Sequence, residues 1–244
     1  MIEASRDASC LIIWAHGWGR SREDFRPFVQ SLSQRASHLL LDFPGFGASP
    51  LPPGIWGTAD YANAMVDIVK AHRNFKKIIW VGHSFGGRVG IQLAARNPEL
   101  IDGMFLIAGA GLPRKRTMPG KLKYWTRIYT YKTLKNIALI LGMNVESLRF
   151  KFSSADYKSA GLLRPIFLKL VHEDLSEQAR QIKCPVNMIY GAEDKDAPPD
   201  IGERLSKLIK NSRFEVLPGH DHFSVLTTGR HLVIKRLSDF MENV

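Results

Sequence analysis

Cysteine is scarce in this chain. Among 244 residues there are two, Cys10 and Cys184, and each borders a strand-like apolar run. So few cysteines exclude a disulfide-rich scaffold and favour buried, reduced thiols in a cytosolic protein. No group of cysteines and histidines has the spacing of a zinc site, and the chain contains no internal repeat or low-complexity tract. The sequence therefore indicates neither a structural metal nor a repeat architecture.

Long apolar runs are also absent. No run approaches the ~18 residues needed to span a bilayer, so we expect no membrane-spanning segment. Residues 1–7 are polar and include acids, unlike a signal peptide, and we predict a cytoplasmic protein. With 45% hydrophobic residues, the chain is long enough for one large domain or for a core domain carrying an inserted piece.

Acidic residues are missing from one stretch. The basic segment, residues 114–135, holds eight Lys or Arg residues and no Asp or Glu, in a chain of net charge +11. The other residues therefore carry only +3, which is 11 minus 8. Such a segment attracts an acidic partner or an anionic surface, or it is a solvated helix face that keeps the protein soluble. No recognised nucleic-acid-binding module surrounds it, so we do not expect nucleic acid as the partner.

Six short apolar runs indicate strands whose two faces are both buried. They span residues 11–15, 38–41, 78–81, 104–107, 186–190 and 214–217. Helical spacing of apolar residues separates them, as in Phe25, Phe28, Val29 and Leu32, and we expect Thr58 to cap the second helix. This alternation predicts an α/β protein with a mostly parallel sheet and helices on both faces.

The interval 112–180 breaks this alternation. It contains helix-like pieces at 134–143 and 164–175, but no convincing strand. We predict a helical lid at 112–180, inserted into a core made of residues 1–111 and 181–244. The alternative is that the same α/β alternation continues through this interval with poor strands.

Gly82-His83-Ser84-Phe85-Gly86-Gly87 is the strongest chemical motif. It lies between a strand-like run and a helix-like segment, as a nucleophile elbow does. Glycines two positions before and after Ser84 permit a turn so tight that the serine oxygen stands clear of the sheet. The alternative is a glycine-rich turn that happens to hold a serine.

The turn after the first strand reads His16-Gly17-Trp18-Gly19. Glycines let the backbone approach a ligand closely, with its N–H groups free to face it. Acyl transfer needs two N–H donors aimed at the developing oxyanion, and Trp18 and Phe85 are the natural pair. We expect the His16 side chain to brace this loop rather than take part in chemistry. The alternative is an ordinary glycine-containing exit from a strand.

An acid and a base are expected in the turns after the fifth and sixth strands. Asp194 is the preferred acid, which would orient a histidine and stabilise the imidazolium. Its competitors are other carboxylates of the same turn, Glu193, Asp196 and Asp200. Two histidines, His220 and His222, compete as the general base, because an imidazole titrates near neutrality and spacing does not decide between them.

Taken together, these motifs resemble the α/β-hydrolase superfamily, in the branch with a small helical cap. The chain order of serine, acid and histidine is that of this class, with each member following a separate strand. The likeness includes Asp42-Phe43-Pro44-Gly45-Phe46-Gly47-Ala48-Ser49 and Gly219-His220-Asp221-His222-Phe223. It extends from about Leu11 to Phe240, and it favours His222 over His220. The family usually opens with an antiparallel strand pair, which must be missing or rudimentary here.

The resemblance implies a serine carboxylesterase, similar to the pimeloyl-carrier-protein methyl ester esterases. Ser84 would be the nucleophile, His222 the base and Asp194 its orienting acid, with Trp18 and Phe85 as the oxyanion hole. The supporting positions are His16, Gly17, Gly82 and Gly86. No metal or organic cofactor is implied, because the triad itself activates the nucleophile. Carbon–carbon bond hydrolases, thioesterases and non-catalytic receptors on the same fold are the alternatives.

The expected partner is a small-molecule ester or acyl substrate. The basic segment begins the predicted lid, where it would draw in an acidic carrier protein, an acyl-CoA or an anionic lipid. The cations proposed for this contact are Arg114, Lys115, Arg116, Lys121, Lys123 and Arg127.

Overall fold

The computed structural model describes residues 2–3, 9–115, 118–142, 144–145 and 155–244. Arg116 of the basic segment, Met143 of a predicted helix, and part of the predicted lid, residues 146–154, lie outside the described residues. The side chains of Lys121, Lys123 and Arg127 also lie outside them, although their backbone is helical.

A seven-stranded sheet forms the centre of the molecule, in the order β1-β3-β2-β4-β5-β6-β7. Its strands are β1 (Ile2–Glu3), β2 (Cys10–Ala15), β3 (Ser37–Leu40), β4 (Lys77–His83), β5 (Gly103–Ile107), β6 (Val186–Gly191) and β7 (Ser212–Leu217). All pairs are parallel except β1 with β3. The six predicted strands are therefore confirmed. The two-residue β1 is the rudimentary antiparallel strand that the sequence left open.

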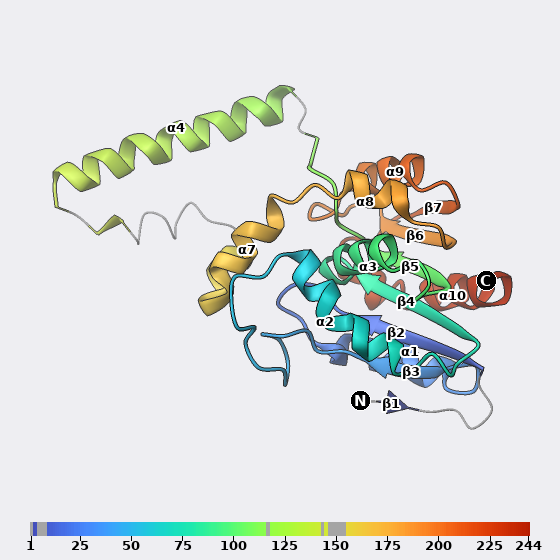
Figure 1. Cartoon of the computed structure of the whole chain (residues 1–244). Helices are drawn as coiled ribbons and strands as arrows, with labels where there is room; N and C mark the ends of the chain where they lie inside the picture. Colours follow the sequence, from blue (N-terminus) through green and yellow to red (C-terminus); the bar gives the residue numbers. More distant parts are fainter. Residues whose placement is uncertain (1, 4–8, 116–117, 143, 146–154) are drawn as a thin grey trace.

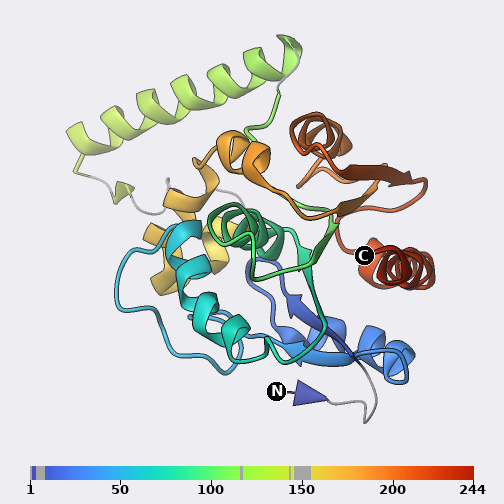
Figure 2. The same cartoon turned by 45° about the vertical axis from the view of Figure 1, so that its right-hand side comes forward.

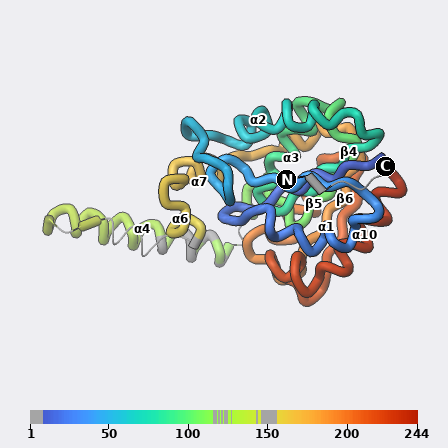
Figure 3. The backbone as a smooth tube through the Cα atoms, turned by 90° about the horizontal axis from the view of Figure 1, so that it is seen from below, coloured from blue at the N-terminus to red at the C-terminus, as the bar shows by residue number. Residues whose placement is uncertain are grey.

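Strand residues alternate between two apolar layers, because successive side chains of a strand point to opposite faces. Leu11 and Ile13 join the layer under α2 (Thr58–Lys70), α3 (Phe85–Arg96), α8 (Ser176–Gln181) and α9 (Pro199–Leu208). Ile12 and Trp14 join the layer under α1 (Arg26–Leu32) and α10 (Arg230–Asn243). Figure 3 shows helices above and below the sheet, which confirms the predicted fold class. Short 3₁₀ turns, η1 (Arg22–Phe25) and η3 (Ser224–Leu226), complete the core.

The expected N-cap of α2 is wrong by one residue. Gly57 is the N-cap, and its backbone N–H donates to the Asp60 carboxylate at 2.7 Å. Thr58 is the first residue of the helix, and its N–H and hydroxyl donate to the Glu173 carboxylate, at 3.0 and 2.6 Å. The elbow helix α3 begins directly after Ser84.

Between β5 and β6 the described residues are helical or irregular and include no strand. This stretch holds α4 (Met118–Ile140), α6 (Ala155–Ser159), η2 (Gly161–Leu163), α7 (Arg164–Val171) and then α8. In Figures 1 and 2, α4 extends away from the body of the molecule, while α7 lies against it near α2. The reading of poor strands is thus wrong for the described residues, and the role of this stretch as a lid stays a prediction.

Candidate active site

Ser84 stands at a sharp turn between β4 and α3. Its φ of 49° and ψ of −105° lie outside the regions that non-glycine residues ordinarily occupy. Such strain persists only where the surroundings hold it, and it concentrates at functional positions. Here the Ser84 N–H donates to the Ile107 carbonyl at 3.1 Å, and the Trp80 indole donates to the Gly86 carbonyl at 3.0 Å. The turn is therefore fixed from both sides.

The two flanking positions, Gly82 and Gly86, require glycine because other backbone segments lie very close to them. A Cβ on Gly82 would lie 2.6 Å from the Gly86 carbonyl oxygen, and one on Gly86 would lie 2.0 Å from the Ala15 carbonyl oxygen. Both distances are shorter than a real Cβ contact, so any side chain would push α3 away from the sheet. This packing gives a physical reason for the spacing of the motif.

His16 braces the loop after β2. The ring is buried, with Nδ1 donating to the Gly17 carbonyl at 2.7 Å and Nε2 accepting from the Phe43 N–H at 3.1 Å. Burial lowers the pKa of His16, which keeps the ring neutral for this pair of bonds. Trp18 follows in the same loop, and its ring packs edge-on against Phe85, with centroids 5.8 Å apart. The two residues expected to donate to an oxyanion are thus in contact.

Asp194 and His222 meet across neighbouring turns. Asp194 follows β6, His222 follows β7, and the His222 Nδ1 lies 2.7 Å from the Asp194 Oδ2. The other carboxylate oxygen of Asp194 accepts from the backbone N–H groups of Asp196 and Ala197, each at 2.8 Å. The carboxylate is fully buried and held in one orientation. A histidine that donates through Nδ1 keeps Nε2 unprotonated and able to accept a proton.

The residues that competed with Asp194 as the acid and with His222 as the base lie in different surroundings. The Asp196 and Glu193 side chains are exposed, and Asp200 pairs with Arg204 at 3.2 Å. The His220 ring packs beside Gly229, while its backbone carbonyl accepts from the Glu193 N–H at 2.9 Å. His220 therefore links the two turns through its backbone rather than through its imidazole.

His83 has a positioning role that the sequence motif did not reveal. Its Nε2 donates to the His222 backbone carbonyl at 3.0 Å, and the two rings pack at a tilt of 44° with centroids 4.7 Å apart. Burial, with a smaller contribution from the charge of His222, lowers the pKa of His83 to about 3, so the ring is neutral. A Cβ on Gly17 would lie 2.7 Å from the His83 Nδ1, which requires glycine there. His83 thus connects the elbow to both neighbouring loops.

The helical stretch borders this edge of the sheet at two points. The Phe167 ring of α7 packs on Trp18, with centroids 5.3 Å apart. Arg114, the first cation of the basic segment, donates to the Asp196 carbonyl and lies 3.8 Å from the Asp196 carboxylate. The inserted stretch therefore contacts both the loop that holds Trp18 and the turn that holds Asp194.

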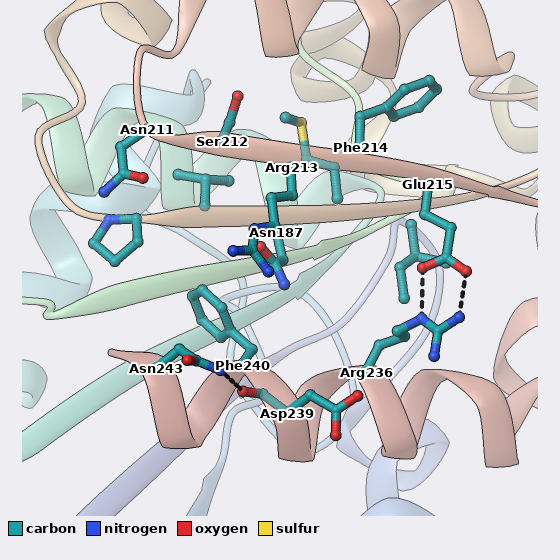
Figure 4. Close-up of a pocket in the computed structure, with 14 residues that line it drawn as sticks. Asn187, Asn211, Ser212, Arg213, Phe214, Glu215, Arg236, Asp239, Phe240 and Asn243 are labelled. Atoms are coloured by element: carbon teal, nitrogen blue, oxygen red, sulfur yellow. Dashed lines mark hydrogen bonds and ion pairs between the residues drawn. The ribbon is translucent and has the colours of Figure 1, made fainter.

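A large cavity lies elsewhere. It measures about 760 Å³ and is lined by residues of β6, β7 and α10. Figure 4 shows Glu215 and Arg236 forming a two-bond ion pair on its wall, at 2.6 and 2.8 Å. None of the candidate catalytic residues lines it, and Pro185 and Asn211 place it at the opposite ends of β6 and β7 from Asp194 and His222. Its volume alone does not make it a site.

Comparison with known proteins identifies the family. The profile of the alpha/beta hydrolase fold family matches residues 11–228. The chain belongs to this family. A pimeloyl-[acyl-carrier protein] methyl ester esterase of Chromobacterium violaceum is 25% identical over 95% of this chain and 94% of its own length. The hydrolase YugF of Bacillus subtilis, uncharacterized by name, is 25% identical over 95% and 89%.

Solved structures agree on the fold of this α/β hydrolase. An enol-lactonase from Burkholderia xenovorans LB400 superposes with a TM-score of 0.73 and 21% identity, covering 99% of this chain and 95% of its own. The family match, the esterase relative and this structural likeness together show that the chain is a hydrolase enzyme of the α/β fold. The family recognised from the sequence motifs is thus confirmed.

Neither a metal centre nor a transmembrane helix is visible in the part of the chain that the structure describes. Within those residues, no three His, Cys, Asp or Glu side chains are grouped as a metal site requires. Of the helices described, none combines the length and apolar character needed to cross a bilayer.

Proposed function

We propose that the protein is a serine hydrolase that cleaves a carboxylic ester through an acyl-enzyme. The observation that carries this is the 2.7 Å contact between His222 Nδ1 and the buried Asp194 carboxylate, at the same sheet edge as the strained Ser84 turn. An oriented imidazole beside an elbow serine is the arrangement that activates a hydroxyl nucleophile.

In this proposal the Ser84 Oγ attacks the ester carbonyl while its proton passes to His222 Nε2. The carbonyl oxygen becomes an oxyanion facing the N–H groups of Trp18 and Phe85. Collapse breaks the ester C–O bond, and His222 returns the proton to the leaving alcohol. Water then attacks the acyl-enzyme carbonyl and gives a proton to His222. The acyl C–Oγ bond breaks, His222 passes the proton to Ser84 Oγ, and the carboxylic acid is released. Asp194 holds His222 and stabilises its charged form throughout.

The test is covalent labelling followed by turnover. A fluorophosphonate probe should label the wild-type enzyme and fail to label Ser84→Ala, whereas Ser206→Ala should label normally. On a p-nitrophenyl ester, Ser84→Ala should lower kcat by at least ~10³-fold with an unchanged circular dichroism spectrum, because members of a triad act as a unit. Labelling of Ser84→Ala at the wild-type level would contradict the assignment.

A second experiment compares ester hydrolysis with two other reactions that enzymes of this fold catalyse, thioester hydrolysis and carbon–carbon bond hydrolysis. A panel of oxygen esters, thioesters and carbon–carbon bond substrates, varied in acyl length, should show the highest kcat/KM for oxygen esters. Higher kcat/KM for a thioester or for carbon–carbon cleavage would keep the triad and change the substrate class.

For the substrate we propose an anionic acyl ester, carried free, on coenzyme A or on an acidic carrier protein. Arg114 beside the Asp196 turn places a cation next to the site. The relative named as a pimeloyl-[acyl-carrier protein] methyl ester esterase supports an acyl carrier. Added salt should lower kcat/KM for an anionic ester more than for a neutral one. Parallel salt curves for the two esters would contradict this proposal.

A further inference from the structure

The first part of α4 leaves a row of apolar side chains in solvent. Met118, Leu122, Trp125 and Tyr129 recur at intervals of four, three and four residues, which places them on one face of the helix. Their exposed fractions are 76, 68, 51 and 62%, and the Trp125 and Tyr129 rings lie 6.0 Å apart. More exposed apolar residues follow towards the end of the helix and just beyond it, namely Leu134, Ile137, Leu139, Ile140 and Leu141. An apolar surface of this extent marks an interaction site.

The same helix is strongly cationic. Five of the eight Lys or Arg residues of the basic segment lie in α4, residues 114–145 contain no acid, and Lys132 and Lys135 of α4 are exposed. The aromatic residue Tyr131 of α4 accompanies them, besides the Trp125–Tyr129 pair. A helix that combines Trp, Tyr and Leu with Lys and Arg suits the boundary between lipid headgroups and acyl chains. It is not apolar enough to cross the bilayer.

We propose that α4 binds the surface of an anionic lipid bilayer, with Met118, Leu122, Trp125 and Tyr129 inserted among the acyl chains. The lysines and arginines would contact the headgroups. An acidic carrier protein would use these cations, but it gives no role to four exposed apolar side chains in a row. A second copy of this chain is disfavoured, because two segments of charge +8 repel each other.

Such docking would present the candidate site to the membrane. The chain enters α4 from Arg114, beside the Asp196 turn, and returns through α7, whose Phe167 packs on Trp18. Figures 1 and 2 show α4 reaching out from this side of the molecule. The inference goes beyond the proposed ester hydrolysis and does not depend on it, because the contacts of α4 with lipid involve none of the catalytic groups.

Vesicle co-sedimentation of the full-length chain tests the proposal. We expect binding to phosphatidylcholine vesicles with 30% phosphatidylglycerol, and at least about tenfold weaker binding to pure phosphatidylcholine. Raising the salt concentration from 0.1 to 1 M should weaken binding, because the screening length falls from ~10 to ~3 Å. Brominated acyl chains should quench the tryptophan emission of the wild type, and this quenching should be lost in Trp125→Tyr.

Matched variants separate the two contributions. Leu122→Ser with Trp125→Ser, and Lys132→Gln with Lys135→Gln, should each lower the vesicle affinity by about tenfold. Leu51→Ser, which changes a leucine of 53% exposure outside α4, and Lys210→Gln should bind as the wild type does. All of these variants of α4 and of the control positions should hydrolyse a short water-soluble ester at the wild-type rate. Ser84→Ala, in turn, should bind vesicles with the wild-type affinity.

Four results would overturn the proposal. These are no binding to either vesicle, equal binding to both, a stable complex with a purified acidic carrier protein in place of vesicle binding, or a dimer that Leu122→Ser with Trp125→Ser dissolves. The third would assign α4 to a carrier, and the fourth to self-association.

Discussion

At the scale of single residues, the two histidines after β7 are separated by what their rings contact. The His222 ring donates to the buried Asp194, whereas the His220 ring lies beside Gly229. His222→Ala should therefore lower kcat by at least ~10³-fold, like Ser84→Ala, and His220→Ala should cost much less. The measurement is kcat on a p-nitrophenyl ester for variants with wild-type circular dichroism. A reversed order of the two losses would make His220 the base.

The acid is tested by an isosteric change. In Asp194→Asn the amide can still accept from the Asp196 and Ala197 N–H groups, so the turn should keep its shape. The amide NH₂ would then face His222 Nδ1 and favour the tautomer that carries its proton on Nε2, which lowers kcat by ~10³- to 10⁴-fold. Asp196→Asn, at an exposed neighbour, should have little effect. Wild-type kcat in folded Asp194→Asn would assign the role to another carboxylate.

The sequence predicted which of these residues are candidates, but not all of their contacts. Ser84, Asp194 and His222 each follow an apolar strand, and strand ends of a parallel sheet share one edge, so their meeting could be expected. The bond from His83 to His222 joins residues 139 positions apart and depends on how closely the two turns approach. No local feature of the sequence shows how closely these two turns approach each other.

At the scale of elements, one half-buried arginine connects the inserted stretch to the core. Arg88 of α3 is half-buried, and its guanidinium donates to the Leu170 and Glu173 carbonyls at 3.1 and 3.3 Å. Burial is the main cause that lowers its pKa, with Glu173 and Asp174 opposing the shift. The carboxylate of Glu173 also accepts from Thr58 at the start of α2. This network ties α7 to α2 and α3.

Removing that arginine should loosen the stretch. Arg88→Met leaves the Leu170 and Glu173 carbonyls without their donor and the nearby carboxylates without their cation, so we expect a loss of about 1–3 kcal/mol in the free energy of unfolding. Arg96→Met, on an exposed position of the same helix, should change it by less than about 0.5 kcal/mol. Urea unfolding measures both. Equal stability of the two variants would show that the Arg88 contacts contribute nothing.

Strands were easier to predict than helices. Each strand is a continuous apolar run, since both faces of the sheet are covered. The helix α9 was missed, although Ile201 and Leu205 are spaced at i, i+4 and are buried. The direction of α4 could not be predicted, because its apolar residues are exposed and no buried face determines how it packs.

At the scale of the whole molecule, folding lowers the pKa values of two buried histidines, His83 and His16. The pKa of His83 falls to about 3 and that of His16 also falls, with burial the largest cause in each case. In the unfolded chain both return to about 6.5 and bind protons below that pH. Between about pH 6.5 and 3 the unfolded state therefore binds more protons than the folded state. The free energy of unfolding must fall as the pH is lowered through this window.

His83→Gln should remove one of these two contributions. Glutamine keeps an N–H for the His222 carbonyl but does not titrate, so the free energy of unfolding should depend less steeply on pH. Each buried histidine accounts for up to about 1.4 kcal/mol per pH unit, which urea unfolding between pH 7.5 and 5 resolves. This range lies above the ordinary carboxylate pKa values, so the histidines dominate the slope. His231→Gln, at an exposed position, should keep the wild-type slope. If His83→Gln keeps it too, His83 is not held neutral by folding, and its hydrogen bond to His222 must be reassigned to a charged ring.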